Sequence, residues 1–255
     1  MNAPIIEGCV DSHASALTAC QGGADRLELC ANLAIGGTTP SRALFQRVQR
    51  DCAVKINVLI RPRFGDFLYS EAELDEMREE IEAFRDLGAN GVVIGVLTPE
   101  GEVDEGQMRC LMDAAEGMDV TLHRAFDMTR DPDAALDAAI RLGCRTILTS
   151  GQARNAPEGA EVLRKLVLRA SGRIEIMAGC GVRSENIRAI HERTGVRAFH
   201  TTGRSAPLDS GMIYRKPGVS MGLPSLSEYE RWQTDEREFE ECAKIVHALG
   251  TEHVK

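Results

Sequence analysis

The chain has 255 residues, and its 43% hydrophobic and 27% charged residues are ordinary for a globular protein. The formal net charge of −9 argues against nucleic acid as the main partner, because phosphate contacts need clustered Lys and Arg. The sequence contains no run of about 18 apolar residues, so it predicts no membrane span. The first residues lack the basic start and long apolar core of a signal peptide. We therefore expect a cytoplasmic protein, with no membrane partner, whose eight cysteines are reduced.

Eight short β-rich runs alternate with helical patterns along the chain. In order, they cover residues 5–10, 26–30, 55–61, 91–97, 119–124, 146–150, 174–179 and 198–202. Strands that alternate with helices predict an α/β fold with a parallel sheet. Eight of them favour a closed (β/α)8 TIM barrel, with an open doubly wound sheet as the alternative. We expect one domain over residues 1–255.

The helical patterns carry recognisable start signals. Residues 71–87 place apolar side chains at steps of three and four, and Ser70 with Glu73 forms a capping box before them. Further helix starts are predicted where a capping residue precedes Pro or Glu, at Thr39, Asp131 and Ser184.

The alternation stops after the eighth strand. Several Pro and Gly residues, among them Pro207, Pro217 and Pro224, predict a long irregular loop over residues 206–232. Residues 235–249 then have a helical pattern, which we interpret as the last barrel helix. Long loops of this kind are often functional lids.

Polar side chains gather where the predicted strands end. His123, Arg124 and Asp127 follow one another at the end of the fifth strand, and Arg61 and Arg63 at the end of the third. Because the carboxyl ends of the strands form one rim in a barrel, these side chains are predicted to converge.

Alternation along the strands predicts which side chains share a face. If that face is the interior, the barrel encloses Glu7, Glu28, Arg61, His123 and His200. Buried charges must pair or bind a ligand. Two alternatives remain: the polar positions face outward between the helices, or they form a purely structural ion-pair network.

A glycine-rich turn follows the seventh strand. Gly179 and Gly181 would let the backbone approach a ligand, and the helix start behind them favours an anion. Thr202 at the end of the eighth strand would lie beside this turn, as in the phosphate sites of many TIM barrels. Tight packing of strand on helix explains the glycines equally well.

Two cysteines stand at the ends of consecutive strands. If the first two strands pair in register, Cys9 and Cys30 lie close enough to bind a soft ion such as Cu(I). The alternative is that both pack as small apolar residues.

Many segments together resemble the CutC family, named for copper homeostasis. They include Gly22-Gly-Ala-Asp-Arg-Leu-Glu-Leu-Cys30 and His123-Arg-Ala-Phe-Asp127, with residues 7–12, 36–41, 60–63, 65–70, 148–151, 177–183, 209–212 and 219–222. The resemblance implies a cytoplasmic, often oligomeric TIM barrel, with Cu(I) held by two cysteines that match Cys9 and Cys30. The sequence departs from the family pattern at Thr201 and Thr202, where Ser-Ser is common, and at Cys180, which adds a third thiol near the rim.

Two hypotheses follow. In the first, the chain is a copper-homeostasis protein with Cys9 and Cys30 as metal ligands. In the second, it is an enzyme for a small anionic or hydroxylated metabolite, in which His123 acts as acid or base, Asp127 or Glu28 sets its protonation, and Arg61 contributes to catalysis. The predicted substrate- and anion-binding residues are Arg63, Arg124, Ser150, Gly179, Gly181, His200 and Thr202. We also expect a homo-oligomer, with a dimer favoured.

Overall fold

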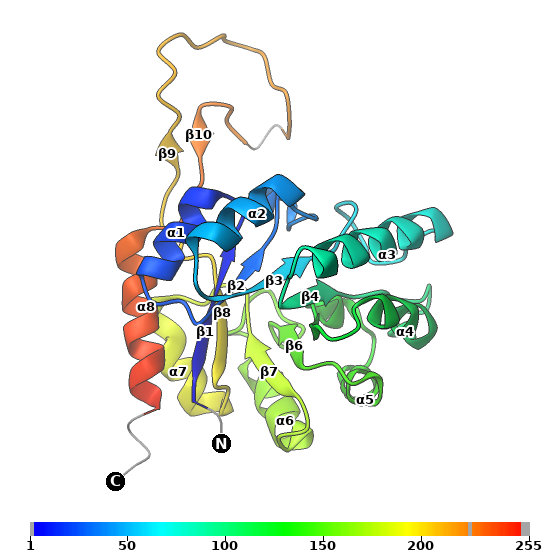
Figure 1. Cartoon of the computed structure of the whole chain (residues 1–255). Coiled ribbons are helices and arrows are strands. Elements are labelled where there is room, and N and C mark those ends of the chain that lie inside the picture. Colours follow the sequence, from blue (N-terminus) through cyan, green and yellow to red (C-terminus); the bar gives the residue numbers. More distant parts are fainter. Residues whose placement is uncertain (1–2, 224–225, 251–255) are drawn as a thin grey trace.

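The eight predicted strands close into a barrel in which each strand pairs in parallel with its two neighbours (Figure 1). The fold is taken from a computed structural model that describes residues 3–223 and 226–250. The strands are β1 (Ile5–Val10), β2 (Arg26–Leu29), β3 (Lys55–Leu59), β4 (Gly91–Ile94), β5 (Asp119–Leu122), β6 (Thr146–Thr149), β7 (Glu175–Ala178) and β8 (Ala198–Thr201). The predicted TIM barrel is confirmed.

Helices surround the barrel and cover the outer faces of its strands (Figure 1). They are α1 (His13–Gln21), α2 (Arg42–Asp51), α3 (Glu71–Asp86), α4 (Glu105–Ala114), α5 (Pro132–Leu142), α6 (Ala160–Ala170), α7 (Ser184–Thr194) and α8 (Glu236–Leu249), with 3-10 turns η1 (Leu33–Ile35) and η2 (Arg124–Met128). The main hydrophobic core lies between helices and strands and contains the fully buried side chains of Phe45, Phe84 and Phe239. It leaves the interior of the barrel free for polar residues.

One predicted helix start is wrong. The α3 capping box and the start of α5 are confirmed, but α2 is capped by Ser41, whose hydroxyl accepts from the Leu44 N–H at 3.2 Å. The hydroxyl of Thr39, the predicted cap, accepts instead from the Arg61 N–H at 2.9 Å. Thr39 therefore ties the loop before α2 to the end of β3.

Apart from β1, the strands end one to three residues earlier than predicted on the side where the site lies. Cys30, His123, Ser150 and Thr202 each follow directly after a strand, and Arg61 follows β3 by two residues. Their side chains thus belong to the first turns of the loops at the carboxyl ends of the strands.

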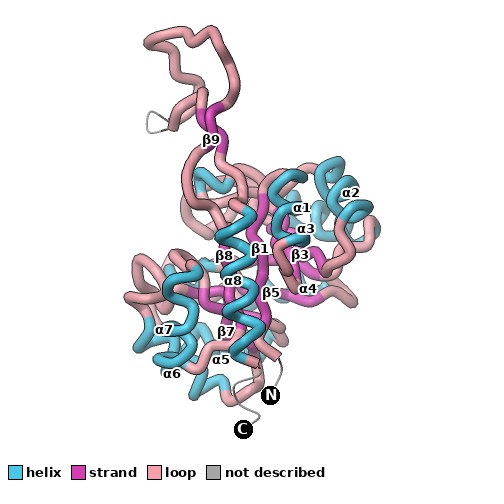
Figure 2. Tube along the Cα trace, turned by 90° about the vertical axis from the view of Figure 1, so that its left-hand side faces the viewer, coloured by secondary structure: helices cyan, strands magenta, loops and turns pink. Residues whose placement is uncertain are grey.

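Residues 206–223 and 226–233 belong to an arm that projects away from the barrel (Figures 1 and 2). The segment is not wholly irregular, since β9 (Leu208–Asp209) and β10 (Glu230–Arg231) pair antiparallel at its base. Pro224, one of the residues that predicted this loop, lies outside the described residues. In the described part of the chain, no helix has the length and apolar character needed to cross a membrane.

Candidate functional site

An ion-pair network fills the part of the barrel interior that lies nearer the amino ends of the strands. Glu7 on β1 is fully buried, and its two carboxylate oxygens bind Arg26 Nε and His200 Nδ1, the latter at 2.8 Å. Burial alone would raise the pKa of Glu7, but the Arg26 and His200 charges lower it to about 2. Glu7 is therefore a carboxylate at any physiological pH.

A second layer lies above it, towards the carboxyl ends of the strands. Cys9 stands opposite Glu28 in the β1–β2 register, and its thiol donates to Glu28 Oε1 at 3.6 Å. One potential ligand atom from each of Cys9, Glu28 and His200 lies within 4.8 Å of the other two. Glu28 Oε2 is buried and has no hydrogen-bond partner among the described residues.

The charges of this layer are unusual. Burial raises the pKa of Glu28 to about 7, and the Glu7 carboxylate raises it too, although the nearby His200 opposes this. Burial disfavours the charged form of His200, but Cys9, Glu28 and Glu7 together raise its pKa well above the ordinary range. These neighbours favour the protonated form of His200, and Glu28 is likewise held towards its protonated form.

Cys9 and Cys30, the two predicted metal ligands, do not lie opposite each other in the register of β1 and β2. Because the register places Cys9 opposite Glu28, Cys30 lies beyond it and its thiol donates to the Val10 carbonyl at 3.4 Å. The adjacent Cys30 thiol and burial raise the pKa of Cys9 well above its usual range. The Cys9 thiol lowers the pKa of Cys30, but burial and nearby carboxylates outweigh this and raise it. Both thiols are protonated at neutral pH.

His123 follows β5 and faces the same interior. Its Nδ1 accepts from the Ala125 N–H at 3.1 Å, whereas its buried Nε2 has no partner among the described residues. The ring packs against Phe67, with centroids 4.8 Å apart. Burial and the nearby Arg61 guanidinium lower the pKa of His123 to about 3, so the imidazole is neutral.

Arg61 is held rigidly by backbone carbonyls. Its Nη1 donates to Gly36 and Gly37 at 3.0 Å each, and its Nη2 donates to Gly65 at 2.7 Å. The guanidinium lies over the Phe67 ring, 4.9 Å from its centroid, and its Nε is unpartnered among the described residues. Phe67 therefore contacts both Arg61 and His123. It holds the cationic guanidinium and the neutral imidazole on one wall of the interior.

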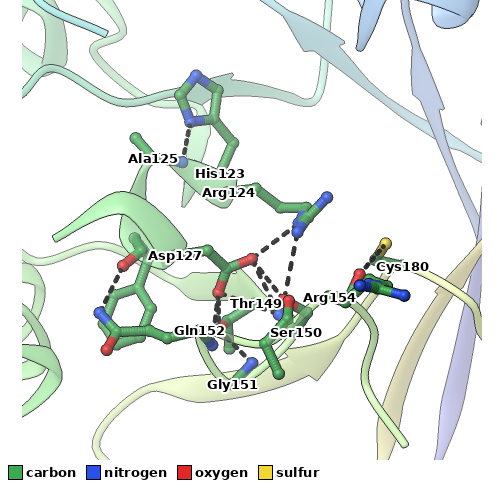
Figure 3. A network of polar contacts seen from close by, with 12 residues as sticks. His123, Arg124, Ala125, Asp127, Thr149, Ser150, Gly151, Gln152, Arg154 and Cys180 are labelled. Atoms are coloured by element: carbon green, nitrogen blue, oxygen red, sulfur yellow. Dashed lines mark hydrogen bonds and ion pairs between the residues drawn. The ribbon is translucent and has the colours of Figure 1, made fainter. Parts of the chain in front are cut away.

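Asp127 has another role than the predicted one. Its carboxylate accepts from Arg124 Nε at 2.7 Å, from the backbone N–H groups of Ser150 and Gln152 at 3.1 Å, and from the Thr149 hydroxyl (Figure 3). Asp127 thus ties η2 to the loop after β6. The imidazole of His123, whose protonation Asp127 was predicted to set, takes its hydrogen bond from the Ala125 N–H instead.

Three other predicted residues do not line the cavity that these groups surround. Arg63 forms an ion pair with Glu73 at the start of α3, with Nε and Oε1 2.6 Å apart. The Ser150 hydroxyl belongs to the network around Asp127. A Cβ added to Gly179 would lie 2.4 Å from Leu148 Cδ1, so this glycine serves close packing.

The helix start predicted to bind an anion already holds one of the chain's own carboxylates. α7 begins at Ser184 with Arg183 as its N-cap. Glu238 on α8 accepts from the Ser184 N–H and from the Ser184 hydroxyl, both at 2.9 Å. Sequence reasoning missed Glu238 because it lies 54 residues away, on a helix with an ordinary amphipathic pattern.

These groups surround a cavity of about 360 Å³ that opens at the carboxyl ends of the strands. Its floor and walls contain Cys9, Glu28, Leu59, Arg61, Phe67, His123, Leu148 and His200, and its rim contains Arg124, Gly181, Arg183, Thr202, Arg204 and Glu238. The predicted convergence therefore holds for most of the candidates. Phe67, Arg183 and Glu238 are additions that no strand-end pattern pointed to.

Comparisons with known proteins agree with this architecture. A family model described as the CutC family matches residues 4–205. A family protein CutC from Parabacteroides distasonis is 49% identical over 233 residues, which cover 91% of this chain and 96% of the relative. The "copper homeostasis protein cutC homolog" of Homo sapiens is 44% identical over 235 residues, 92% of this chain and 86% of that protein. The crystal structure of the putative copper homeostasis protein CutC from Streptococcus agalactiae has a TM-score of 0.75 and 33% identity, covering 78% of this chain and 98% of that chain.

Proposed function

This chain belongs to the CutC family, and from that premise we propose that it is a cytoplasmic copper-homeostasis protein that binds Cu(I) at Cys9. The observation that carries the proposal is the meeting of a thiol, an imidazole and a carboxylate within 4.8 Å. Sulfur and imidazole nitrogen are ligands that suit Cu(I). The buried thiol of Cys30 is the second ligand that we favour, and His200 is the alternative.

Binding would release protons. Both thiols must lose theirs before they can ligate, and burial holds the pKa of Cys9 and Cys30 high. His200 would have to give up the proton on Nε2, because its Nδ1 is held by Glu7. The proposal therefore requires an affinity for Cu(I) that rises with pH.

A competition titration of Cu(I) with a chromophoric chelator tests the proposal under reducing, anaerobic conditions. Cys9→Ser should weaken binding by at least about tenfold, or about 1.4 kcal/mol. Cys30→Ser and His200→Gln then identify the second ligand, since only the variant that removes it should weaken binding as well. Cys110→Ser, at an exposed thiol on α4, is the matched control. Equal affinity of the wild type and the Cys9→Ser/Cys30→Ser double variant would exclude a thiol site.

We propose a second candidate function, an enzyme for a small anionic or hydroxylated metabolite. A cavity of about 360 Å³ is far larger than one metal ion needs and is of the size that small-molecule sites have. Arg61 and His123 on its wall have no role in the copper site. A thermal-shift screen against sugars, phosphates and organic acids tests this candidate, and the absence of any stabilising compound would count against it.

We also propose that copies of the chain associate through the arm. Its apolar side chains are exposed, Ile213 fully, together with Leu208, Met212, Tyr214, Met221 and Trp232, and such patches are typical of interfaces. Sedimentation velocity should give a dimer that Ile213→Ser with Met221→Ser dissociates. Leu168→Ser, at an exposed apolar residue on α6, should leave the dimer intact. A monomeric wild type would refute this part.

A further inference from the structure

The hydrogen bond to His123 fixes which of its nitrogens carries the proton. The backbone N–H of Ala125 donates to Nδ1 at 3.1 Å, so Nδ1 must present a lone pair. A neutral imidazole with an unprotonated Nδ1 has its proton on Nε2. Nε2 is therefore a hydrogen-bond donor.

The surroundings keep His123 neutral and immobile. The side chain is buried and lies near the Arg61 guanidinium, and it caps the N-terminal end of η2, where the backbone N–H groups disfavour a positive charge. Phe67 packs on the ring, and at Gly95 an added Cβ would lie 2.6 Å from His123 Cε1 and Nδ1. The donor at Nε2 thus has a fixed position.

This donor has no partner among the described residues. His123 is 5% exposed and lines the cavity. A buried N–H without an acceptor is unfavourable relative to a satisfied one, so native proteins seldom keep one. An acceptor atom supplied by a ligand would remove this deficit.

A second unsatisfied atom lines the same cavity. Glu28 Oε2, on the floor, is buried and also lacks a partner in the described part of the chain. A carboxyl group can accept from a hydroxyl of a ligand when it is ionised and can donate to it when it is protonated. Leu59, Phe67 and Leu148 supply apolar lining around these two polar points.

We propose that the cavity binds a small hydroxycarbonyl compound, whose carbonyl oxygen accepts from His123 Nε2–H and whose hydroxyl group binds Glu28. This inference rests on the second candidate function and names its substrate class. It also changes the role of His123, because a neutral imidazole that is already protonated at Nε2 polarises a carbonyl rather than taking a proton from the substrate. Fixed donors at this position stabilise negative charge that develops on the oxygen.

NMR of the ¹⁵N-labelled histidines of the wild-type protein tests the tautomer directly. The assignment of His123 follows from the signals lost in His123→Gln, among the six histidines of the chain. We expect the Nε2-protonated neutral form from pH 5 to pH 8. An Nδ1-protonated ring, or titration in this range, would overturn the proposal whatever the variants do.

Ligand titrations test the substrate class. Dihydroxyacetone and hydroxypyruvate are the probes, and glycerol and glycerate are matched controls in which the carbonyl is reduced. The carbonyl compounds should shift the His123 Nε2 resonance and bind at least about tenfold more tightly than their reduced partners, since one hydrogen bond to a buried donor has roughly that effect. His123→Phe should abolish the preference and His123→Gln, which retains an N–H donor, should restore part of it.

The possible outcomes distinguish failure of this inference from failure of the proposed enzyme function on which it rests. If neither carbonyl probe shifts Nε2, or if carbonyl and reduced compounds bind equally, the inference fails. Stabilising metabolites without a carbonyl group would in that case leave the enzyme candidate standing. If the metabolite screen yields no ligand and the probes do not bind, both fail.

Discussion

Replacing Glu28 with glutamine should make the protein more stable at alkaline pH. Burial raises the pKa of this carboxyl from 4.5 to about 7, which means that the folded state holds the Glu28 proton more tightly than the unfolded state. Stability therefore falls as the pH rises from about 4.5 to 7, and the full cost is present above pH 7. Since one pKa unit corresponds to about 1.36 kcal/mol, this cost is about 3 kcal/mol.

Glutamine has nearly the shape of the protonated carboxyl and does not ionise. Glu28→Gln should thus be more stable than the wild type by about 3 kcal/mol at pH 8 and should match it at about pH 4. A gain of this size at a buried position is expected where a residue is kept for function at the expense of stability.

Glu7 gives a matched control with the opposite sign. Its pKa is lowered from 4.5 to about 2 by Arg26 and His200, so its contribution is present above pH 4.5 and is lost as the pH falls towards 2. Glu7→Gln should therefore lose about 3 kcal/mol at pH 8. Both carboxyl groups are buried near His200. Opposite changes in stability would therefore show that the direction of the pKa shift, and not burial alone, determines the effect.

Urea unfolding followed by circular dichroism, on metal-free reduced protein between pH 4 and pH 9, measures both effects. The decisive comparison is the free energy of unfolding of Glu28→Gln and the wild type at pH 8. If Glu28→Gln is equally stable or less stable there, while Glu7→Gln is destabilised, then Glu28 is ionised in the folded protein at little cost and the reasoning is wrong.

Three further predictions concern residues in and around the site. Gly95→Ala should destabilise the protein by about 1–3 kcal/mol in urea unfolding and shift the His123 NMR signals, because the added methyl overlaps the imidazole; an unchanged His123 spectrum would contradict this. Asp127→Ala should cost about 3 kcal/mol in the same assay, since several donors lose their acceptor, and a loss below 1 kcal/mol would contradict the structural role. Arg63→Ala should leave the affinity for Cu(I) and for metabolites unchanged in titration calorimetry, whereas Arg61→Ala should weaken metabolite binding; equal effects would place Arg63 in the site after all.

The sequence was sufficient for the fold because its signals are local. Each strand is an apolar run of a few residues, and the capping box of Ser70 and Glu73 spans a single turn. The convergence of Glu28, Arg61 and His123 also followed, because barrel geometry brings all carboxyl ends of the strands to one rim.

The errors have a different origin. Position at a strand end does not determine which neighbour a long side chain reaches. Arg63 stands two residues after Arg61, but its guanidinium turns to Glu73, while that of Arg61 is held by backbone carbonyls. Asp127 follows His123 closely but finds its donors on the loop after β6. These outcomes depend on contacts between distant segments, which a pattern along one strand does not contain.

Glu238 on α8 determines whether the start of α7 is free to bind an anion. Its carboxylate covers the first amide of α7 from α8, which lies beyond residue 205, where the match to the family model ends. A barrel cut off at that point would expose this amide to any incoming phosphate ester. In the longer chain the Glu238 carboxylate occupies this helix start, so that the first amide of α7 is not free to bind an anion.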